Sequence, residues 1–117
     1  MKIMLVTDEP NLESKIAKRF GHANYYLIYD LDNDTFEAME NPGHGEKHDV
    51  LYDLAKKGVT TYIVGNIGPG AYETVQEIGA EVYLARLMKA KDAIAKFKAG
   101  ELQKLENPTL KRSIERH

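Results

Sequence analysis

The chain begins with a continuous run of hydrophobic residues, which is followed at once by residues typical of turns. Lys2 to Thr7 has the sequence KIMLVT, and Asp8, Glu9 and Pro10 follow at once. A continuous apolar run of this length is typical of a strand that is covered on both faces of its sheet. The pattern therefore predicts a strand over residues 2–7 at the centre of a sheet.

The next two apolar segments have the composition of paired strands. Tyr25 to Leu31 (YYLIYDL) and Thr35 to Glu40 (TFEAME) are rich in residues that favour strands. Asp32-Asn33-Asp34 separates them and supplies turn residues at the length of a hairpin loop. We expect these two strands to pair in the antiparallel direction.

From about residue 46 onward, helical and strand patterns alternate. Apolar residues at a spacing of three to four predict helices, short β-favouring runs predict strands, and glycines mark the helix ends. The expected elements are a helix over Glu46 to Lys57 that stops at Gly58, a strand over Val59 to Val64, a helix that begins at Pro69 and closes at Gly79, a strand over Glu81 to Ala85, and a helix lined by Leu87, Ala90, Ile94 and Phe97 that stops near Gly100.

The expected order of elements is β-β-β-α-β-α-β-α. An antiparallel opening followed by βαβ units predicts an α/β fold with a mixed five-stranded sheet, flanked by helices on both faces, in the ribonuclease H-like arrangement. Residues 1–100 then form one domain. Residues 101–117 are charged and loosely patterned, and Pro108 interrupts them, so we expect a mobile tail or an interaction segment.

Composition removes several classes of function. Sixteen Lys and Arg residues oppose 18 Asp and Glu residues in the 117-residue chain, so its formal charge of −2 gives no attraction to nucleic acid or to anionic lipid. The chain contains no cysteine, which excludes disulfides, zinc sites of the CxxC kind and clusters held by thiolates. We expect a cytoplasmic protein in which any metal is bound through histidine or carboxylate.

A glycine-rich turn follows the predicted strand over Val59 to Val64. Residues 65–70 (GNIGPG) lead directly into the helix that begins at Pro69, so backbone N–H groups around Asn66, Gly68 and Gly70 could face an anion. The glycine spacing is GxxGxG, and Ala71 and Tyr72 stand where a P-loop needs lysine and serine or threonine. The turn predicts an anion site and not a nucleotide site. The alternative is a tight turn that needs glycine for positive φ.

Three of the four histidines lie in the loops on either side of the predicted hairpin. His22 lies in RFGHA, and His44 and His48 lie in GHGEKHD. A helix that starts near Gly45 would place His44 and His48 one turn apart, where two imidazoles can share a metal ion. The alternative is that these histidines are ordinary solvated residues of polar loops.

Catalysis has weaker support in the sequence than binding. Hydrolases of the ribonuclease H-like class hold two metal ions with carboxylates near the first strand, but KIMLVT carries no acidic residue. Asp8 and Asp30 stand at a turn and at a strand end, where carboxylates commonly cap backbone groups. We therefore expect no enzymatic activity.

Several motifs together resemble the dinitrogenase iron-molybdenum cofactor biosynthesis family, which includes NifX, NafY and the carboxy-terminal domain of NifB. The most specific are an FGxA loop before a tyrosine-rich strand and a GxIGPxA turn. The resemblance covers roughly residues 2–98 and rests on Ser14, Arg19-Phe20-Gly21-His22-Ala23, Tyr25 to Asp30, Asn41-Pro42, Gly58-Val59 and residues 64–71 (VGNIGPGA).

The resemblance implies an α/β domain that binds the iron-molybdenum cofactor, or its iron–sulfur precursor, and passes it between a donor and an acceptor protein. It also implies that His22 is a ligand of the cluster, with Arg19 close by. A preassembled cluster brings its own sulfides, so a carrier without cysteine needs only an imidazole and groups that stabilise an anion. The competing hypothesis is a regulatory or protein-interaction module of the same fold that binds no cluster.

Overall fold

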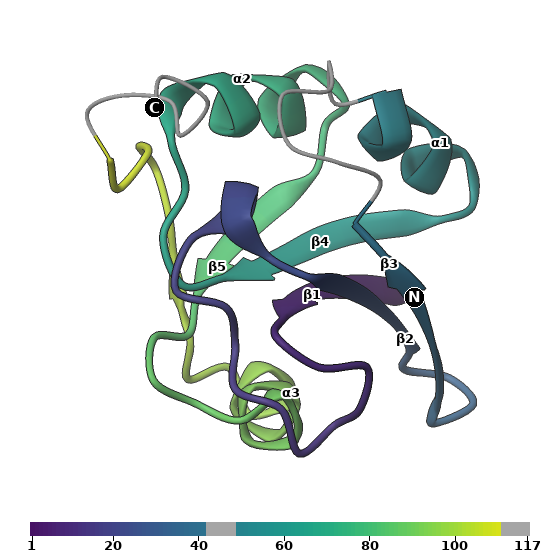
Figure 1. The fold of residues 1–117 in the computed structure, drawn as a ribbon. Coiled ribbons are helices and arrows are strands. Elements are labelled where there is room, and N and C mark those ends of the chain that lie inside the picture. The colour runs from purple at the N-terminus through teal and green to yellow at the C-terminus, as the bar shows by residue number, and fades with distance from the viewer. Residues whose placement is uncertain (42–48, 111–117) are drawn as a thin grey trace.

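The strand Lys2–Thr7 (β1) lies inside a single mixed sheet, as its continuous apolar run predicts. The computed structural model describes residues 1–41 and 49–110, and the strand order in the sheet is β3-β2-β1-β4-β5-β6 (Figure 1). The other strands are β2 (Tyr25–Asp30), β3 (Thr35–Glu40), β4 (Val59–Val64), β5 (Glu81–Leu84) and β6 (Gln103–Lys104).

The predicted pairings are confirmed. β1 and β2 pair in the antiparallel direction, as do β2 and β3, so the two strands after β1 form the expected hairpin. β4 runs parallel to both β1 and β5. Residues Ile3 to Val6 of β1 are fully buried because both faces of this strand are covered.

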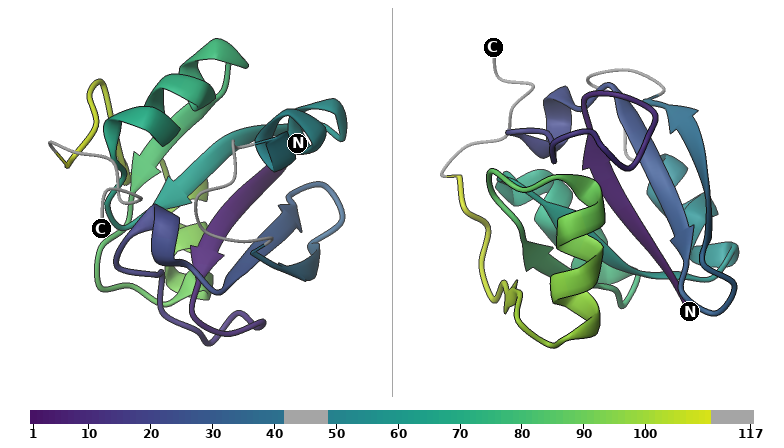
Figure 2. Two further views of the ribbon diagram at one scale, coloured as in Figure 1. Left: turned by 45° about the horizontal axis from the view of Figure 1, so that its top comes forward. Right: turned by 90° about the horizontal axis from the view of Figure 1, so that it is seen from below.

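In the described part of the chain, three α-helices cover the two faces of the sheet. α1 (Asp49–Lys56) and α2 (Pro69–Glu77) lie on one face, and α3 (Ala90–Lys98) lies on the other, where the view from below shows it in front of the sheet (Figures 1 and 2). Gly58 follows α1 with a φ of 98°, the conformation expected of a glycine that ends a helix. No helix in the two described ranges has the length and hydrophobicity to cross a membrane.

The prediction of five strands is wrong, because residues 103–104 form a sixth. β6 pairs with β5 and gives the exposed backbone groups of that edge a hydrogen-bonding partner. Leu105 is buried and donates its N–H to the carbonyl oxygen of Val82 at 2.8 Å. Part of the segment expected to be a mobile tail or an interaction segment is therefore hydrogen-bonded to residues 67 and 82, as far as residue 110.

The last helix begins later than its apolar spacing predicts. α3 starts at Ala90, whereas the pattern included Leu87. The backbone of Leu87 has a φ of 63°, which lies outside the right-handed helical region, so this residue cannot continue the helix toward the N-terminus. Of the predicted first helix, residues 46–48 lie outside the described residues.

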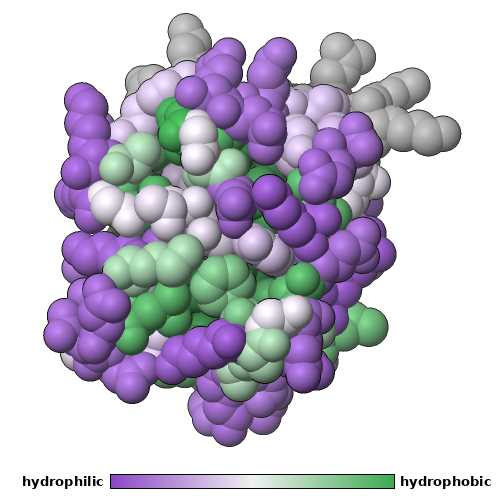
Figure 3. All heavy atoms as spheres, turned by 180° about the vertical axis from the view of Figure 1, so that it is seen from behind, coloured by the Kyte–Doolittle hydropathy of each residue, from purple (hydrophilic) through white to green (hydrophobic). Residues whose placement is uncertain are grey.

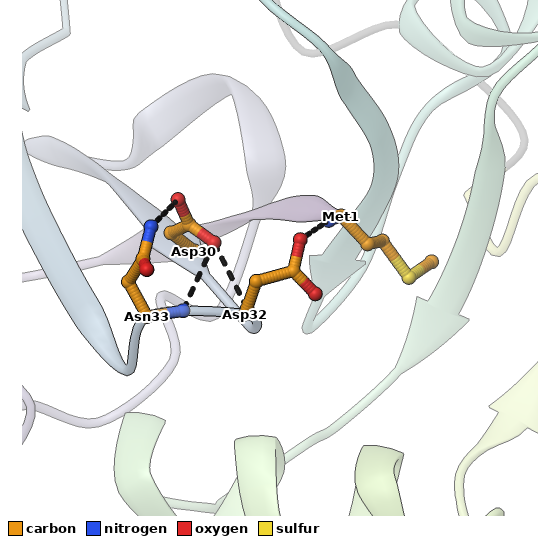
Figure 4. Close-up of polar contacts among 4 residues, drawn as sticks. All are labelled: Met1, Asp30, Asp32 and Asn33. Carbon is orange, nitrogen blue, oxygen red and sulfur yellow. Dashed lines mark hydrogen bonds and ion pairs between the residues drawn. The ribbon is translucent and has the colours of Figure 1, made fainter.

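The turn of the β2–β3 hairpin is held by the carboxylate of Asp30 (Figure 4). One oxygen accepts the N–H groups of Asp32 (2.9 Å) and Asn33 (3.3 Å), and the other accepts the side-chain amide of Asn33 (3.0 Å). These bonds hold the pKa of Asp30 below its ordinary value, and the bond from the Asn33 side chain has the largest effect. Asp30 therefore has the capping role that its position predicts.

A buried tyrosine hydroxyl lies in the face of the sheet beneath α1 and α2. Tyr62 in β4 is 0% exposed, and its hydroxyl has no hydrogen-bond partner among the described residues. The hydroxyl of Tyr26, in β2, reaches the side-chain oxygen of Asn41 at 3.4 Å. Burial raises the pKa of Tyr26 to about 12 and also raises the pKa of Tyr62, so both hydroxyls stay protonated at neutral pH.

We expect Tyr62→Phe to leave the free energy of unfolding unchanged or to raise it by up to about 1 kcal/mol, because the buried hydroxyl makes no compensating hydrogen bond within residues 1–41 and 49–110. Tyr26→Phe is the matched control and should lower the free energy of unfolding, because it removes a partner of Asn41. Urea unfolding of the two variants measures both effects. An equal loss of stability in both would contradict the interpretation of Tyr62.

Candidate functional site

The segments that follow β1 and β4 meet at one edge of the sheet. The two strands are parallel neighbours, with Leu5 opposite Ile63, so their carboxyl ends lie side by side. The chain after β1 leads to a short 3-10 helix, η1 (Phe20–His22), and the chain after β4 forms the glycine-rich turn. Two motifs 43 or more residues apart in the sequence are thus neighbours in the fold.

Hydrogen bonds join these two segments directly. The N–H of Phe20 donates to the carbonyl oxygen of Asn66 at 2.8 Å, and the side-chain amide of Asn66 donates to the carbonyl oxygen of Lys18 at 3.0 Å. The N–H of Ala17 donates to the carbonyl oxygen of Val6 at 2.8 Å and so attaches the first segment to β1. Arg19, which immediately precedes η1, is therefore held next to the turn.

Gly65 is required by close packing and not by a positive φ. A β-carbon at this position would lie 2.4 Å from the carbonyl oxygen of Ala17 and 3.0 Å from that of Lys18. The expected alternative for the turn, glycines with positive φ, is wrong: Gly68 has a φ of −83° and a ψ of 171°. The turn contains glycine at position 65 because another backbone segment lies against it.

Arg86 is a residue of this site that the sequence patterns did not reveal. It comes from the loop between β5 and α3, and its guanidinium donates to the side-chain oxygen of Asn66 from Nη2 (2.8 Å) and Nε (3.2 Å). Nε also lies 3.2 Å from the carbonyl oxygen of Gly65. The signal that could have found it is its place just after a third parallel strand, because the carboxyl ends of parallel strands share one edge.

The glycine-rich turn is also contacted from the C-terminal part of the chain. The N–H of Ile67 donates to Oγ1 of Thr109 at 2.8 Å, and the N–H groups of Thr109 and Leu110 donate to the carbonyl oxygen of Ile67 at 3.0 and 3.1 Å. One N–H group of the predicted anion site is therefore already used within the chain. Gly68 caps α2 without a side-chain hydrogen bond, and Gly70 lies in its first turn.

His22 ends η1 with an exposed side chain. η1 is anchored by Phe20, which is buried and stacks against Tyr26 with 6.2 Å between the ring centroids. The structure thus brings His22, Arg19 and the Asn66 turn to the same edge of the sheet. His44 and His48, the other two predicted ligands, lie outside the described residues.

Residues 1–100 match the family described as dinitrogenase iron-molybdenum cofactor. The chain belongs to this family. An uncharacterized protein of Methanocaldococcus jannaschii is 31% identical to it over 113 residues, which span 91% of this chain and 92% of the relative. The predicted family membership is confirmed.

Two solved structures resemble this member of the family closely. A Thermotoga protein solved by NMR and provisionally described as NifB has 31% sequence identity and a TM-score of 0.81, covering 93% of this chain and 97% of its own. The apo form of the orange protein from Desulfovibrio gigas has 23% identity and a TM-score of 0.83, covering 93% and 96%. The second likeness concerns the fold alone.

Charged residues of both signs come from the segments at this edge of the sheet. An open depression of about 560 Å³ beside the ends of β1 and β3 is lined by three carboxylates, those of Asp8, Glu9 and Glu40, together with Pro10, Asn24, Tyr25 and Asn41. At the Asn66 turn, the guanidinium of Arg86 is hydrogen-bonded to the Asn66 side chain, and Lys18 and Arg19 belong to the segment that is joined to the turn. Negative charge is repelled by the carboxylates of the depression and attracted by the guanidinium of Arg86.

The described part of the site has few side chains that could ligate a metal ion, although the family is named after a metal cofactor. Within residues 1–41 and 49–110, no three histidine, aspartate or glutamate side chains are placed to hold a metal ion together. The described part of the site offers one imidazole, two guanidinium groups and an amide. These groups suit the surface of a preassembled anionic cluster better than a bare metal ion.

Proposed function

We propose that the chain is a non-enzymatic carrier of an iron-molybdenum cofactor or of a related iron–sulfur precursor cluster. The observation that carries this proposal is the hydrogen-bonded junction of the Arg19–His22 segment with the Asn66 turn. It supports the proposal because it joins the segment that carries Arg19 and the exposed His22 to the turn that Arg86 contacts. The family to which the chain belongs supports a cluster as the cargo.

In this proposal His22 ligates the cluster, and Arg19 supplies positive charge beside it. The amide of Asn66 and the backbone around Gly68 and Gly70 line the other side of the cargo, and His44 and His48 are further candidate ligands. The order β3-β2-β1-β4-β5 supports the ribonuclease H-like class. Proteins that deliver and receive the cluster are the proposed partners.

The second candidate function is an interaction or regulatory module without a cluster. One observation favours it: Thr109 occupies the N–H of Ile67, so part of the expected anion site has an internal partner. The two candidates differ in a single measurable property, the retention of a cluster. Anaerobic mixing with isolated cofactor, followed by size-exclusion chromatography and metal analysis, separates them.

We expect His22→Ala to lower cluster retention by on the order of tenfold, equivalent to ~1.4 kcal/mol for one lost specific contact. The variant should unfold at the same temperature as the parent, because the side chain is exposed. His117→Ala is a matched control that removes an imidazole at the last residue, to which no role is assigned. Unchanged retention in both His22→Ala and the His44/His48 double variant would contradict histidine ligation.

The pH dependence of retention distinguishes an imidazole ligand from a charge contact. Only a neutral imidazole can bind a metal, so retention through His22 should fall as the solution is acidified through the range near pH ~6.5 in which histidines ordinarily titrate. A contact that depends only on the guanidinium of Arg19 would not weaken in this range, because arginine stays charged. Retention measured at a series of pH values in parent and His22→Ala tests this difference.

A further inference from the structure

Leu87 combines full exposure with a strained backbone. Four large hydrophobic residues are exposed on the described surface, Met1, Phe36, Tyr52 and Leu87, and Leu87 is the most exposed of them at 90%. Its φ of 63° lies in the left-handed region, which is unfavourable for a bulky side chain. Strain of this kind persists only where the surrounding structure imposes it, and it concentrates at functional positions.

The backbone on both sides of Leu87 is fixed by long-range hydrogen bonds. The carbonyl oxygen of Met88 accepts the N–H of Ile16 at 2.8 Å, and the N–H of Ala90 donates to the carbonyl oxygen of Ser14 at 2.7 Å. On the other side, Arg86 is attached to the Asn66 turn by its guanidinium. Leu87 is therefore presented by a rigid loop, and a rigid group loses little conformational entropy when a partner binds it.

Exposed cations occur in the Leu87 loop itself and in the segment that is hydrogen-bonded to it. Lys15 and Lys89 are opposite each other in an antiparallel bridge, while Lys18 and Arg86 are both hydrogen-bonded to Asn66, Lys18 through its carbonyl group. The nearby carboxylate of Glu13 is paired with Lys89 and Lys91. Because Lys89 is paired within the chain, we call the set Lys15, Lys18, Arg86 and Leu87 the Leu87 surface. Its positive charge stands out in a chain whose formal charge is −2.

Other exposed hydrophobic residues lack this combination. The rear view shows hydrophobic patches that are bordered by hydrophilic residues (Figure 3). The hydroxyl of Tyr52 is bonded to Glu77 at 2.8 Å, and Phe36 belongs to β3, which carries Glu37 and Glu40. Protein-binding surfaces commonly have an apolar centre and a polar rim, and a rim of one charge favours a partner of the opposite charge.

We propose that the Leu87 surface docks an acidic protein, with Leu87 entering an apolar socket of the partner and the cations of the surface meeting its carboxylates. We further identify this partner as a protein that donates or accepts the cluster, and that identification rests on the proposed carrier function. Arg86 touches the Asn66 turn, so a protein docked on Leu87 would lie beside the cargo. Nucleic acid is the weaker alternative, because phosphate contacts gain nothing from an exposed leucine.

The test uses the full chain, labelled with ¹⁵N and free of any cluster, titrated with two synthetic peptides and followed by NMR. One peptide consists of glutamates and leucines, and its counterpart has serine in place of every leucine. The leucine peptide should bind on the order of tenfold more tightly and should perturb the amides around Lys15, Lys18 and Leu87. Leu87→Gly, which relieves the positive φ and so should remain folded, should abolish this preference.

Three results would overturn the proposal. They are equal affinity for the two peptides, a preference that survives in Leu87→Gly, and a duplex DNA probe that binds at the same amides more tightly than the leucine peptide. Because the titration contains no cluster and the retention experiment contains no peptide, a failure of the docking surface is distinguishable from a failure of the carrier function.

Discussion

Gly65→Ala should lower the free energy of unfolding by about 3 kcal/mol, among the largest effects of any single substitution at the site. The added β-carbon would lie 2.4 Å from the carbonyl oxygen of Ala17, far inside van der Waals contact, and backbone atoms cannot rotate away as a side chain can. Relief requires the two segments to separate. Separation would break the hydrogen bonds that Asn66 makes with Phe20 and Lys18.

Thermal unfolding measures this prediction, and a midpoint lowered by roughly 10–20 °C is expected. Gly58→Ala is the matched control, because Gly58 has a φ of 98° with nothing within 4 Å of an added β-carbon. Its cost should be only the backbone strain of about 1 kcal/mol. Equal losses in the two variants would show that Gly65 matters for its conformation and not for the close approach. In folded Gly65→Ala protein, cluster retention should also fall.

Leu5→Ala should lower the free energy of unfolding by about 2–5 kcal/mol. Leu5 is 0% exposed in the middle of the central strand, and it pairs with Leu27 on one side and with Ile63 on the other. Truncation removes the transfer free energy of the buried side chain and leaves a cavity that two flanking strands prevent from closing. The sheet around β1 cannot shift without losing its hydrogen bonds.

Leu87→Ala provides the control for the same chemical change at a 90% exposed position. Alanine keeps a β-carbon, so the strain of the positive φ remains, and the free energy of unfolding should change by less than about 0.5 kcal/mol. Urea unfolding of the two variants gives the comparison. A similar loss in both would mean that burial in β1 does not dominate the stability of the sheet.

Local patterns along the chain were sufficient to predict most of the fold. The apolar run of β1 placed it inside the sheet, the turn residues between β2 and β3 specified a hairpin, and a glycine after α1 marked the end of that helix. Each of these signals depends on a few adjacent residues, whose propensities act before any tertiary contact forms. Family membership followed from short motifs, each of which also consists of a few adjacent residues.

The tertiary structure alone decided how the edge of the sheet is completed. Nothing in residues 103–104 indicates a strand, because β6 exists only where β5 leaves backbone groups to pair. The need for glycine at position 65 depends on the carbonyl of Ala17, which is 48 residues earlier in the chain. Arg86 belongs to the site because its guanidinium is hydrogen-bonded to Asn66. Leu87 lies outside α3 because the residues after it are hydrogen-bonded to the loop that follows β1. These features arise from contacts between distant segments, and the local sequence of either segment does not encode the approach of the other.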